Sequence, residues 1–289
     1  MAKKMKQLKK KMNTIPIIDI QQALKDEPTF IVDGLPIFLD PTHTNISIDV
    51  SGGADSALLA YLIISELNRR KQKCVVHIIT HRRLWDARPW QKKIAENVFE
   101  WLRDMSNPTT VVRHTNFIPP LLEMAEIKLH WRVDPKNIEY HGHRTGECIC
   151  VDGFRDMIMS DYNIDMRYNA TTMNPPIQLE GSVPSRDKTK IDKLDLLSHS
   201  GEYPYYDRKE TNPFIYINKA WVIKQYKDNN ILDLLYTTRS CEGGDVSPSV
   251  PWQLKSPAEW DGLRPDDCGE CFWCAERHWA MDENNVDHC

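Results

Sequence analysis

The chain has 289 residues, 41% of them hydrophobic, and a formal net charge of −4. This length suits one large domain or two small ones, and the composition is that of a soluble globular protein. A slightly acidic chain does not fit broad electrostatic binding of a nucleic-acid duplex, and no stretch approaches the roughly 20 apolar residues of a membrane span.

The N-terminal region, residues 1–45, is predicted to be a tail followed by a short appended segment. Its first residues, MAKKMKQLKKKM, contain lysines but no apolar segment, so they are not a secretory signal and we expect a cytoplasmic protein. A solvated tail is the simpler interpretation, and a weak nucleic-acid contact is the alternative. The stretch TFIVDGLPIFL, with Asp33 and Gly34 at its centre, predicts a small hairpin.

The main domain is predicted to span residues 46–239, and it begins with a strand, a small loop and a helix. Residues 46–50 are apolar and mostly β-branched, which indicates a buried strand. The loop residues are Ser51, Gly52, Gly53, Ala54, Asp55 and Ser56. Leucine and isoleucine then recur at helical spacing from Leu58 to Leu67.

A glycine-rich turn that opens a helix after a parallel strand is typical of an anion site. Backbone N–H groups and the positive end of the helix dipole both face the ligand there. The loop lacks the lysine of a Walker A motif and the spacing of a dinucleotide-binding motif. The alternative is that the glycines serve only the sterics of the turn.

Strand and helix patterns alternate along the rest of this domain. Further strands are predicted at 74–80, 109–115 and 165–172, and helices at 89–104, 120–130, 148–162 and 218–228. The alternation predicts an α/β fold with a doubly wound parallel sheet of the Rossmann type. Residues 174–215 are rich in Pro, Asp, Lys and Ser and are predicted to form loops around a substrate site.

The C-terminal residues, 240–289, are predicted to form a small zinc-binding element. Clustered cysteines in a chain without a signal peptide indicate a metal before disulfides. The candidate ligands are Cys241, Cys268, Cys271 and Cys274, which suit a closed tetrahedral Zn²⁺ site. An iron–sulfur cluster is the alternative metal group, and Cys289 or the pair Cys148 and Cys150 compete for the fourth position.

The motif Ser-Gly-Gly-x-Asp-Ser, directly after an apolar strand, resembles the signature of the PP-loop ATP pyrophosphatases. In that superfamily the loop holds the pyrophosphate of ATP while a nucleophile attacks the α-phosphate. The resemblance implies an adenine nucleotide alpha-hydrolase-like fold, ATP and Mg²⁺ as cofactors, and ATP contacts by residues 51–56. Asp55 is in addition a candidate catalytic residue. The pattern does not explain Asp49, which stands where an apolar residue is expected.

The C-terminal part resembles the 7-cyano-7-deazaguanine synthases, which share a proline-led strand, a lysine that opens a helix, two cysteine elements and an arginine. The matching residues are Pro213, Lys219, Thr238, Ser240, Cys241, Cys268, Gly269, Cys271, Cys274 and Arg277. The two resemblances cover about half of the chain. It departs from that family in the 26 residues between Cys241 and Cys268, and it has no clear Tyr-Pro-Asp-Cys-Arg element.

Five residues outside the loop are candidates for the active site. Asn169, Thr171 and Thr172 end a predicted strand at the carboxyl edge of the sheet, where ligands collect in open α/β folds. Arg277 is a candidate to bind a phosphate or carboxylate, or else it caps the C-terminal helix. Lys219 is a candidate catalytic cation for the phosphates, or else an ordinary helix lysine.

These patterns predict an ATP-dependent ligase that adenylates a small-molecule carboxylate, releases pyrophosphate and amidates the product with ammonia. The resemblance implies conversion of 7-carboxy-7-deazaguanine to 7-cyano-7-deazaguanine, as in queuosine biosynthesis, by a homodimer with one structural zinc. The alternatives are a PP-loop enzyme that adenylates a tRNA base or other macromolecule, a non-catalytic zinc-bearing nucleotide-binding module, and a reductase of adenylyl sulfates. Nucleic acid enters only as a downstream target, and no membrane is involved.

Overall fold

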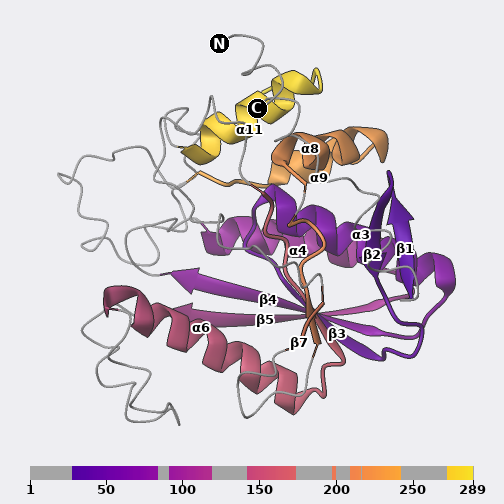
Figure 1. The fold of residues 1–289 in the computed structure, drawn as a ribbon, viewed down its shortest axis with the longest axis vertical. Helices are drawn as coiled ribbons and strands as arrows, with labels where there is room; N and C mark the ends of the chain where they lie inside the picture. The colour runs from indigo at the N-terminus through magenta and orange to yellow at the C-terminus, as the bar shows by residue number, and fades with distance from the viewer. Residues whose placement is uncertain are drawn as a thin grey trace, which may run out of the picture.

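A computed structural model of the chain describes residues 28–83, 91–118, 142–173, 197–199, 209–215, 217–241 and 272–288. In chain order the elements are β1 (Thr29–Val32), β2 (Leu35–Phe38), β3 (Asn45–Asp49), α3 (Ala54–Arg70), β4 (Val75–Arg83), α4 (Gln91–Met105), β5 (Thr110–Ile118), α6 (Gly142–Asp161), β6 (Met166–Tyr168), β7 (Leu197–His199), β8 (Lys209–Thr211), α8 (Lys219–Asp228), α9 (Leu232–Thr237) and α11 (Phe272–Glu283). Figure 1 shows them stacked in layers, with α11 and the C-terminal end on one side of the sheet.

A mixed sheet with the strand order β5-β4-β3-β6-β8-β7 forms the centre of the described part of the chain. The first five strands of this order are parallel, and β7 pairs antiparallel with β8 at the edge. Helices α3 and α4 lie on one face of the sheet and α6 on the other (Figure 1). The predicted α/β fold, with a parallel sheet and helices on both faces, is therefore confirmed.

The order of the strands creates a topological switch point beside β3. The chain runs from β3 to β4 and β5 on one side, and then returns to β6 on the other side of β3. The connections that leave β3 and β6 therefore diverge at the carboxyl ends of these two strands. Open α/β sheets bind their ligands at such switch points.

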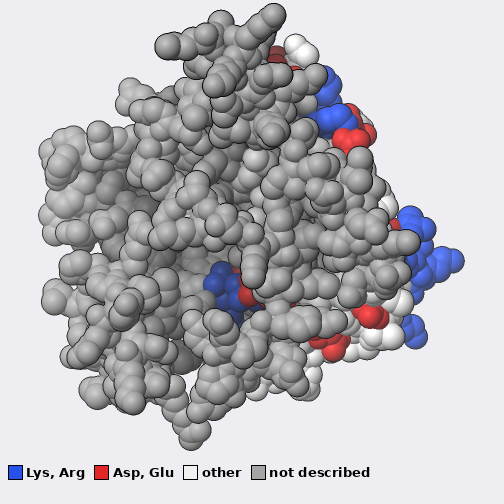
Figure 2. Space-filling view, viewed as in Figure 1, with Lys and Arg blue, Asp and Glu red and all other residues white. Residues whose placement is uncertain are grey.

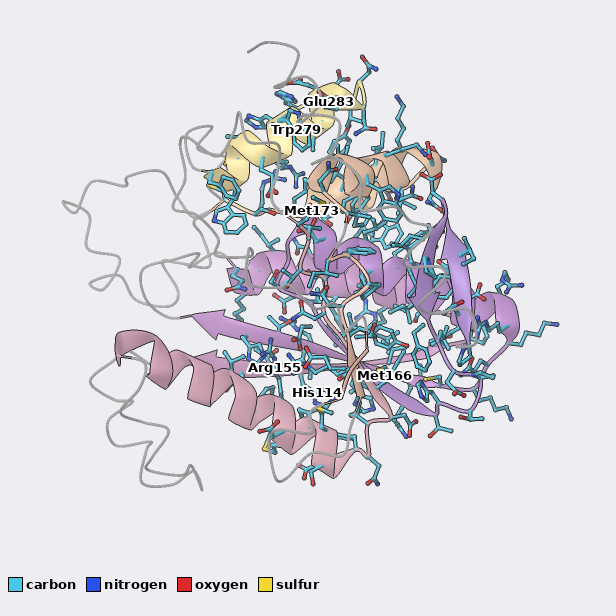
Figure 3. All side chains as sticks on the ribbon, viewed as in Figure 1. His114, Arg155, Met166, Met173, Trp279 and Glu283 are labelled. Carbon is cyan, nitrogen blue, oxygen red and sulfur yellow. The ribbon has the colours of Figure 1, made fainter. Side chains whose placement is uncertain are left out.

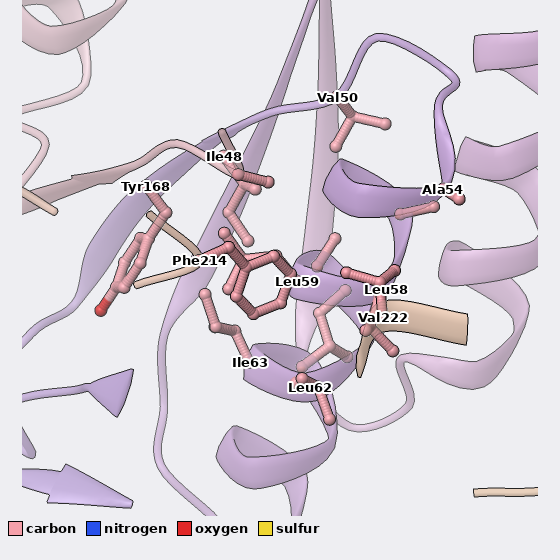
Figure 4. Packing of buried hydrophobic residues seen from close by; sticks show 14 of the residues in the cluster. Ile48, Val50, Ala54, Leu58, Leu59, Leu62, Ile63, Tyr168, Phe214 and Val222 are labelled. Carbon is pink, nitrogen blue, oxygen red and sulfur yellow. The ribbon is translucent and has the colours of Figure 1, made fainter. Parts of the chain in front are cut away.

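The face of the sheet under α3 is apolar. Ile46, Ile48 and Val50 point to this face, because side chains alternate along a strand. They pack against the buried side of α3 and against Phe214 and Val222 (Figure 4). This interdigitated layer fixes the angle at which α3 leaves the sheet.

The hairpin predicted from TFIVDGLPIFL is confirmed as β1 and β2, which pair antiparallel. Asp33 and Gly34 both have positive φ, 46° and 85°, as a two-residue hairpin turn of type I′ requires. Leu35 and Ile37 are fully buried and belong to the same core cluster as α3. The hairpin thus contributes side chains to the central core.

Several boundaries differ from the sequence-based expectation. The predicted strand at 165–172 is only Met166–Tyr168, and α6 begins at Gly142, six residues before the predicted start at 148. Residues 174–215, expected to be loops, contain the strands β7 and β8. Each is three residues long, too short to produce a recognisable alternation. The predicted helix at 120–130 lies outside the described residues.

No helix in the described ranges is both long and apolar enough to cross a membrane.

The face of the sheet under α6 is mixed: Ile79 of β4 belongs to an apolar cluster with residues of α6, and polar side chains share the face with this cluster. Ser47 and His77 are almost fully buried here, and their residues are register partners on β3 and β4. His77 Nδ1 lies 2.9 Å from His114 Nε2, and His77 Nε2 lies 3.3 Å from Asn45 Oδ1. The amide oxygen of Asn45 can only accept a hydrogen bond, so His77 donates to it from Nε2. His77 Nδ1 is then the acceptor of the hydrogen bond from His114 Nε2.

The histidine pair predicts that the protein becomes less stable as the pH is lowered. Burial, reinforced by the charge of His114, lowers the pKa of His77 from 6.5 to about 4, and burial also lowers that of His114. The unfolded chain therefore takes up protons first, and stability is lost as pH falls from about 6.5 to about 4. We expect His77→Asn to reduce this loss by about 2 kcal/mol, measured by urea unfolding across this range.

The matched control for this measurement is His288→Asn, because His288 is half-exposed at the far end of the chain. Its pH profile should follow that of the unsubstituted protein. Equal pH slopes for the His77→Asn variant and the unsubstituted protein would contradict the prediction.

Candidate functional site

The glycine-rich loop leaves the carboxyl end of β3 and turns directly into α3. The helix begins at Ala54, inside the motif, with Gly53 as its N-cap residue. Val50 still belongs to the sheet, because its N–H donates to the carbonyl of Ile79 at 2.8 Å. Only Ser51, Gly52 and Gly53 thus connect the strand to the helix.

The two serines of the motif close the loop on itself. The Ser51 N–H donates to Ser56 Oγ at 3.3 Å, and the Ser56 hydroxyl donates to the Gly53 carbonyl at 3.2 Å. Gly53 N–H lies 3.4 Å from Ser51 Oγ. These hydrogen bonds are long, but together they link the loop to the first turn of α3.

The surroundings require glycine at position 52 and leave little room for a side chain at position 53. Gly52 has φ of +85°, and a Cβ there would lie 3.0 Å from the backbone nitrogen of Ala95. A Cβ on Gly53 would lie 3.3 Å from Ser240 Oγ. The loop is therefore pressed between α4 and the segment 238–241, whose Arg239 N–H donates to the Gly52 carbonyl at 3.0 Å.

The start of α3 has the properties of an anion site. The first N–H groups of a helix have no carbonyl partner within the helix, and no side chain caps this end. The dipole of the 17-residue helix adds partial positive charge at the same place. Free N–H groups and a helix dipole are what an anion site needs, and the binding of an anion by this loop stays a prediction.

Asp55, Lys219 and Thr172 meet in the first turn of α3. Lys219 Nζ donates to Asp55 Oδ2 at 2.5 Å, and Thr172 Oγ1 lies 3.4 Å from the same oxygen. The Lys219 side chain is 2% exposed and that of Asp55 20% exposed. Three residues predicted separately from the sequence therefore form one cluster.

The remaining oxygen of this cluster is not satisfied. Asp55 Oδ1 is buried and has no hydrogen-bond partner among the described residues. A buried carboxylate oxygen without a donor is costly, and a divalent cation or a ligand hydroxyl would satisfy it. Asp55 is thus the residue of the cluster best placed to hold Mg²⁺.

Helix α8 fixes this arrangement from the other side. It begins at Lys219, behind the N-cap Asn218, whose side chain accepts the N–H of Trp221. Further along α8, the buried hydroxyl of Tyr226 donates to the carbonyl of Ala54 at 2.7 Å. Two side chains of α8 therefore reach the first turn of α3.

Asn169 and Thr171 shape the turn after β6. Asn169 Oδ1 accepts hydrogen bonds from the Thr171 N–H at 3.1 Å and from its hydroxyl at 2.9 Å. This closed turn is what brings the next residue, Thr172, to Asp55. A direct substrate contact of Asn169 and Thr171 stays a prediction.

Arg277 lies inside the protein, 1% exposed, on α11. Its guanidinium donates to the carbonyl of Leu235 at 3.0 Å and to Thr238 Oγ1 at 2.9 Å. These contacts join α11 to the end of α9 and to the segment that touches the loop. They favour the structural alternative for Arg277 over a substrate contact.

Two of the four predicted zinc ligands belong to the described residues. Cys241 and Cys274 are buried, at 1% and 0% exposed, whereas Cys268 and Cys271 lie outside the described ranges. Among the residues whose placement is described, no group of three or more His, Cys, Asp or Glu side chains is arranged to hold a metal.

Asp49 is the residue that the sequence patterns left unexplained. It lies on the α6 face at the end of β3, and its Oδ2 contacts Arg155 at 2.6 Å and Arg167 at 2.9 Å. Burial opposes its ionisation, but the two guanidinium groups prevail and lower its pKa. Arg167 also contacts Glu210 at 3.2 Å. Neither arginine has a local sequence signal, because β6 and α6 are far from β3 along the chain.

No family model and no curated protein matches the sequence. Solved structures with a similar fold include the following two. The U34-tRNA thiolase NcsA from Methanococcus maripaludis, with its 4Fe–4S cluster, has 13% identity and a TM-score of 0.41, over 94% of this chain and 80% of that one. NAD+ synthetase from Burkholderia pseudomallei has 11% identity and a TM-score of 0.32, over 93% of this chain and 87% of that one. Both scores are too low to transfer an activity.

The buried ion pair predicts that removing the lysine alone strongly destabilises the protein, and that removing the aspartate charge as well restores part of the stability. Lys219→Met leaves the Asp55 carboxylate partly buried without its cation, so we expect a loss of about 3 kcal/mol. Adding Asp55→Asn removes the uncompensated charge and should restore at least half of this loss. Urea unfolding of both single variants and the double variant measures the coupling.

Lys224→Met is the control for the ion pair, because Lys224 pairs with Asp33 and Asp228 on the exposed side of the same helix. It should cost less than about 1 kcal/mol. Additive effects of the Lys219 and Asp55 substitutions would show that the two side chains do not interact.

Proposed function

We propose that the protein is an ATP-dependent enzyme that adenylates a carboxylate substrate, releases pyrophosphate and then amidates the adenylate with ammonia. The observation that carries the proposal is the loop at residues 51–56. Its backbone is held ready at the start of α3, beside a buried lysine–aspartate pair that ends in one unsatisfied oxygen. This combination suits a triphosphate and its metal ion better than it suits a simple turn.

The loop and the helix would hold the pyrophosphate part of ATP. The N–H groups of Ala54, Asp55 and Ser56 are in the first turn of α3, where an anion replaces the missing carbonyls. Gly52 and Gly53 let the phosphates approach the backbone closely. Because the geometry exists before binding, little reorganisation accompanies the build-up of charge on the leaving pyrophosphate.

Lys219 and Asp55 would both help to compensate the negative charge of the phosphates, Lys219 directly and Asp55 by holding Mg²⁺. A carboxylate beside phosphates is repulsive unless a cation lies between them. Lys219 supplies one positive charge at 2.5 Å from Asp55 Oδ2, and Oδ1 remains as a ligand for Mg²⁺. When bound, Mg²⁺ would neutralise the phosphates and polarise the α-phosphate for attack. Thr172 would keep the carboxylate in its orientation.

The acceptor would bind at the switch point between β3 and β6. Its carboxylate would attack the α-phosphate in line, with positioning and electrostatics as the main sources of catalysis. No protein nucleophile is needed for adenylation or for attack by ammonia. The sequence resemblance to the 7-cyano-7-deazaguanine synthases supports 7-carboxy-7-deazaguanine as this acceptor and a homodimer as the working form.

A single structural zinc is part of the proposal. Cys241 and Cys274 are buried thiols, as ligands of a closed site need to be. Cys241 follows Ser240, which lies against the loop at Gly53. A zinc ion held by these two residues with Cys268 and Cys271 would therefore stabilise the segment that supports the ATP site.

A product assay tests the proposed reaction. Protein incubated with ATP, Mg²⁺, ammonium and 7-carboxy-7-deazaguanine should form AMP, pyrophosphate and the amide base, identified by mass spectrometry. The nitrile should follow when a second ATP activates the amide oxygen for loss of water, with a second AMP and pyrophosphate. Ser51→Ala removes a hydroxyl that orders the loop and should lower kcat/KM about 10- to 100-fold.

Ser47→Ala is the matched control, because Ser47 is on β3, the strand that leads into the loop, and its buried side chain is on the α6 face. The activity of this variant should be unchanged. ATP binding without conversion of the base would reject this acceptor and direct the search to other carboxylates and to tRNA. Failure of ATP to bind would reject the enzyme itself.

The zinc site predicts a defined metal content. Purified protein should contain one zinc per chain by elemental analysis, and Cys241→Ser or Cys274→Ser should lower this content and the melting temperature. Cys74→Ser is the control, because burial raises the pKa of the Cys74 thiol to about 12 and keeps it protonated. Iron with visible absorbance in place of zinc would establish the iron–sulfur alternative.

A further inference from the structure

The ion cluster around Asp49 lies directly beside the proposed active site. Asp49 is the last residue of β3, two positions before Ser51, at the strand end that borders the switch point. Its side chain is on the α6 face, opposite to the face that carries α3. The cluster and the loop therefore lie at the same end of β3, on opposite faces of the sheet.

The contacts of Asp49 are unequal for its two oxygens. Both guanidinium groups, those of Arg155 and Arg167, contact Oδ2. Oδ1 is buried and has no hydrogen-bond partner within the described part of the chain. The carboxylate is thus held firmly on one side and presents an unsatisfied acceptor on the other.

The charges around this oxygen restrict what it can bind. Two guanidinium groups within 3 Å of the carboxylate disfavour a metal ion or an ammonium ion. The negative charge on Oδ1 disfavours a carboxylate or phosphate. A neutral N–H donor satisfies the oxygen without either repulsion.

The cluster keeps part of its surface exposed. Asp49 and Arg155 have 13% and 17% of their side-chain surface exposed. Figure 2 shows basic and acidic side chains next to one another near the middle of this face, and Figure 3 labels Arg155 in the same part of the view. Asp49 Oδ1 itself is buried, so a ligand donor that reaches it would be withdrawn from water as well.

We infer that Asp49 recognises a neutral N–H group on the edge of a heteroaromatic base that binds at the switch point. The inference rests on the proposed function, which supplies two such bases, the acceptor and the adenine of ATP. Arg155 and Arg167 act as positioning residues that hold the carboxylate. A purine-like ring with an amino group or ring N–H is the ligand chemistry that fits.

Paired ligands that differ by one donor test this recognition in the unsubstituted protein. In the first arm, 7-carboxy-7-deazaguanine is compared with its analogues that lack the 2-amino group or carry a 1-methyl group. In the second arm, ATP is compared with purine riboside triphosphate, which lacks the 6-amino group. Calorimetry should show binding that is about 10- to 100-fold weaker for the donor-deficient member of one pair, and the arm that responds identifies the base.

Asp49→Asn connects the effect to this side chain. The difference within the responding pair should shrink to less than about threefold in this variant, since an amide no longer offers a charged acceptor. A merely structural Asp49 would instead weaken all ligands equally and keep the difference. Asp165→Asn is the matched control: Asp165 accepts N–H groups of Thr44 and Asn45 at the opposite end of the sheet, and the difference should persist there.

The outcomes separate the inference from the proposed function. Equal binding within both pairs overturns the role of Asp49, even if the base is converted and the proposed function holds. A donor-dependent effect in the ATP arm supports the role even if 7-carboxy-7-deazaguanine neither binds nor reacts. A donor effect that survives Asp49→Asn also overturns the inference.

Discussion

The buried contact between Lys219 and Asp55 is the interaction on which the candidate site depends. It joins the first residue of α8 to the first turn of α3, two elements that are far apart in sequence. Tyr226 of α8 adds a hydrogen bond to Ala54 in the same turn. Charge pairing alone adds little stability in a buried place once desolvation is included. The ion pair contributes specificity instead, because Lys219 and Asp55 are both satisfied only when α8 packs against α3 in this orientation.

A second constraint is the support of the loop from the C-terminal side. The segment 238–241 touches Gly52 and Gly53, and Arg277 of α11 holds that segment through Thr238. The glycine-rich loop is thus supported by residues from the C-terminal part of the chain. Cys241 is the last residue of this supporting segment and Cys274 is on α11, so changes at these cysteines have a physical route to the loop.

The two faces of the sheet show how one strand serves two purposes. In β3, Ile46 and Ile48 face the apolar layer under α3, while Ser47 and Asp49 face α6. The alternation is visible in the sequence, but a buried strand of a parallel sheet is expected to be apolar on both sides. On the second face Asp49 Oδ2 is paired with Arg155 and Arg167, whereas Ser47 Oγ and Asp49 Oδ1 are buried and have no hydrogen-bond partner among the described residues. Such a departure from simple burial is what a binding face requires.

The sequence by itself determined the strand, loop and helix around residues 46–67, the parallel α/β fold and the hairpin at Asp33 and Gly34. These features follow from short-range rules, namely periodicity, glycine at positive φ and the geometry of a helix start. Only the tertiary structure decided that Asp55, Thr172 and Lys219 meet, that Arg277 is a brace, and that Asp49 is held by Arg155 and Arg167. Each of these depends on contacts between distant segments. Long-range packing leaves no periodic signal in the chain, so the same residues remained separate candidates until the fold brought them together.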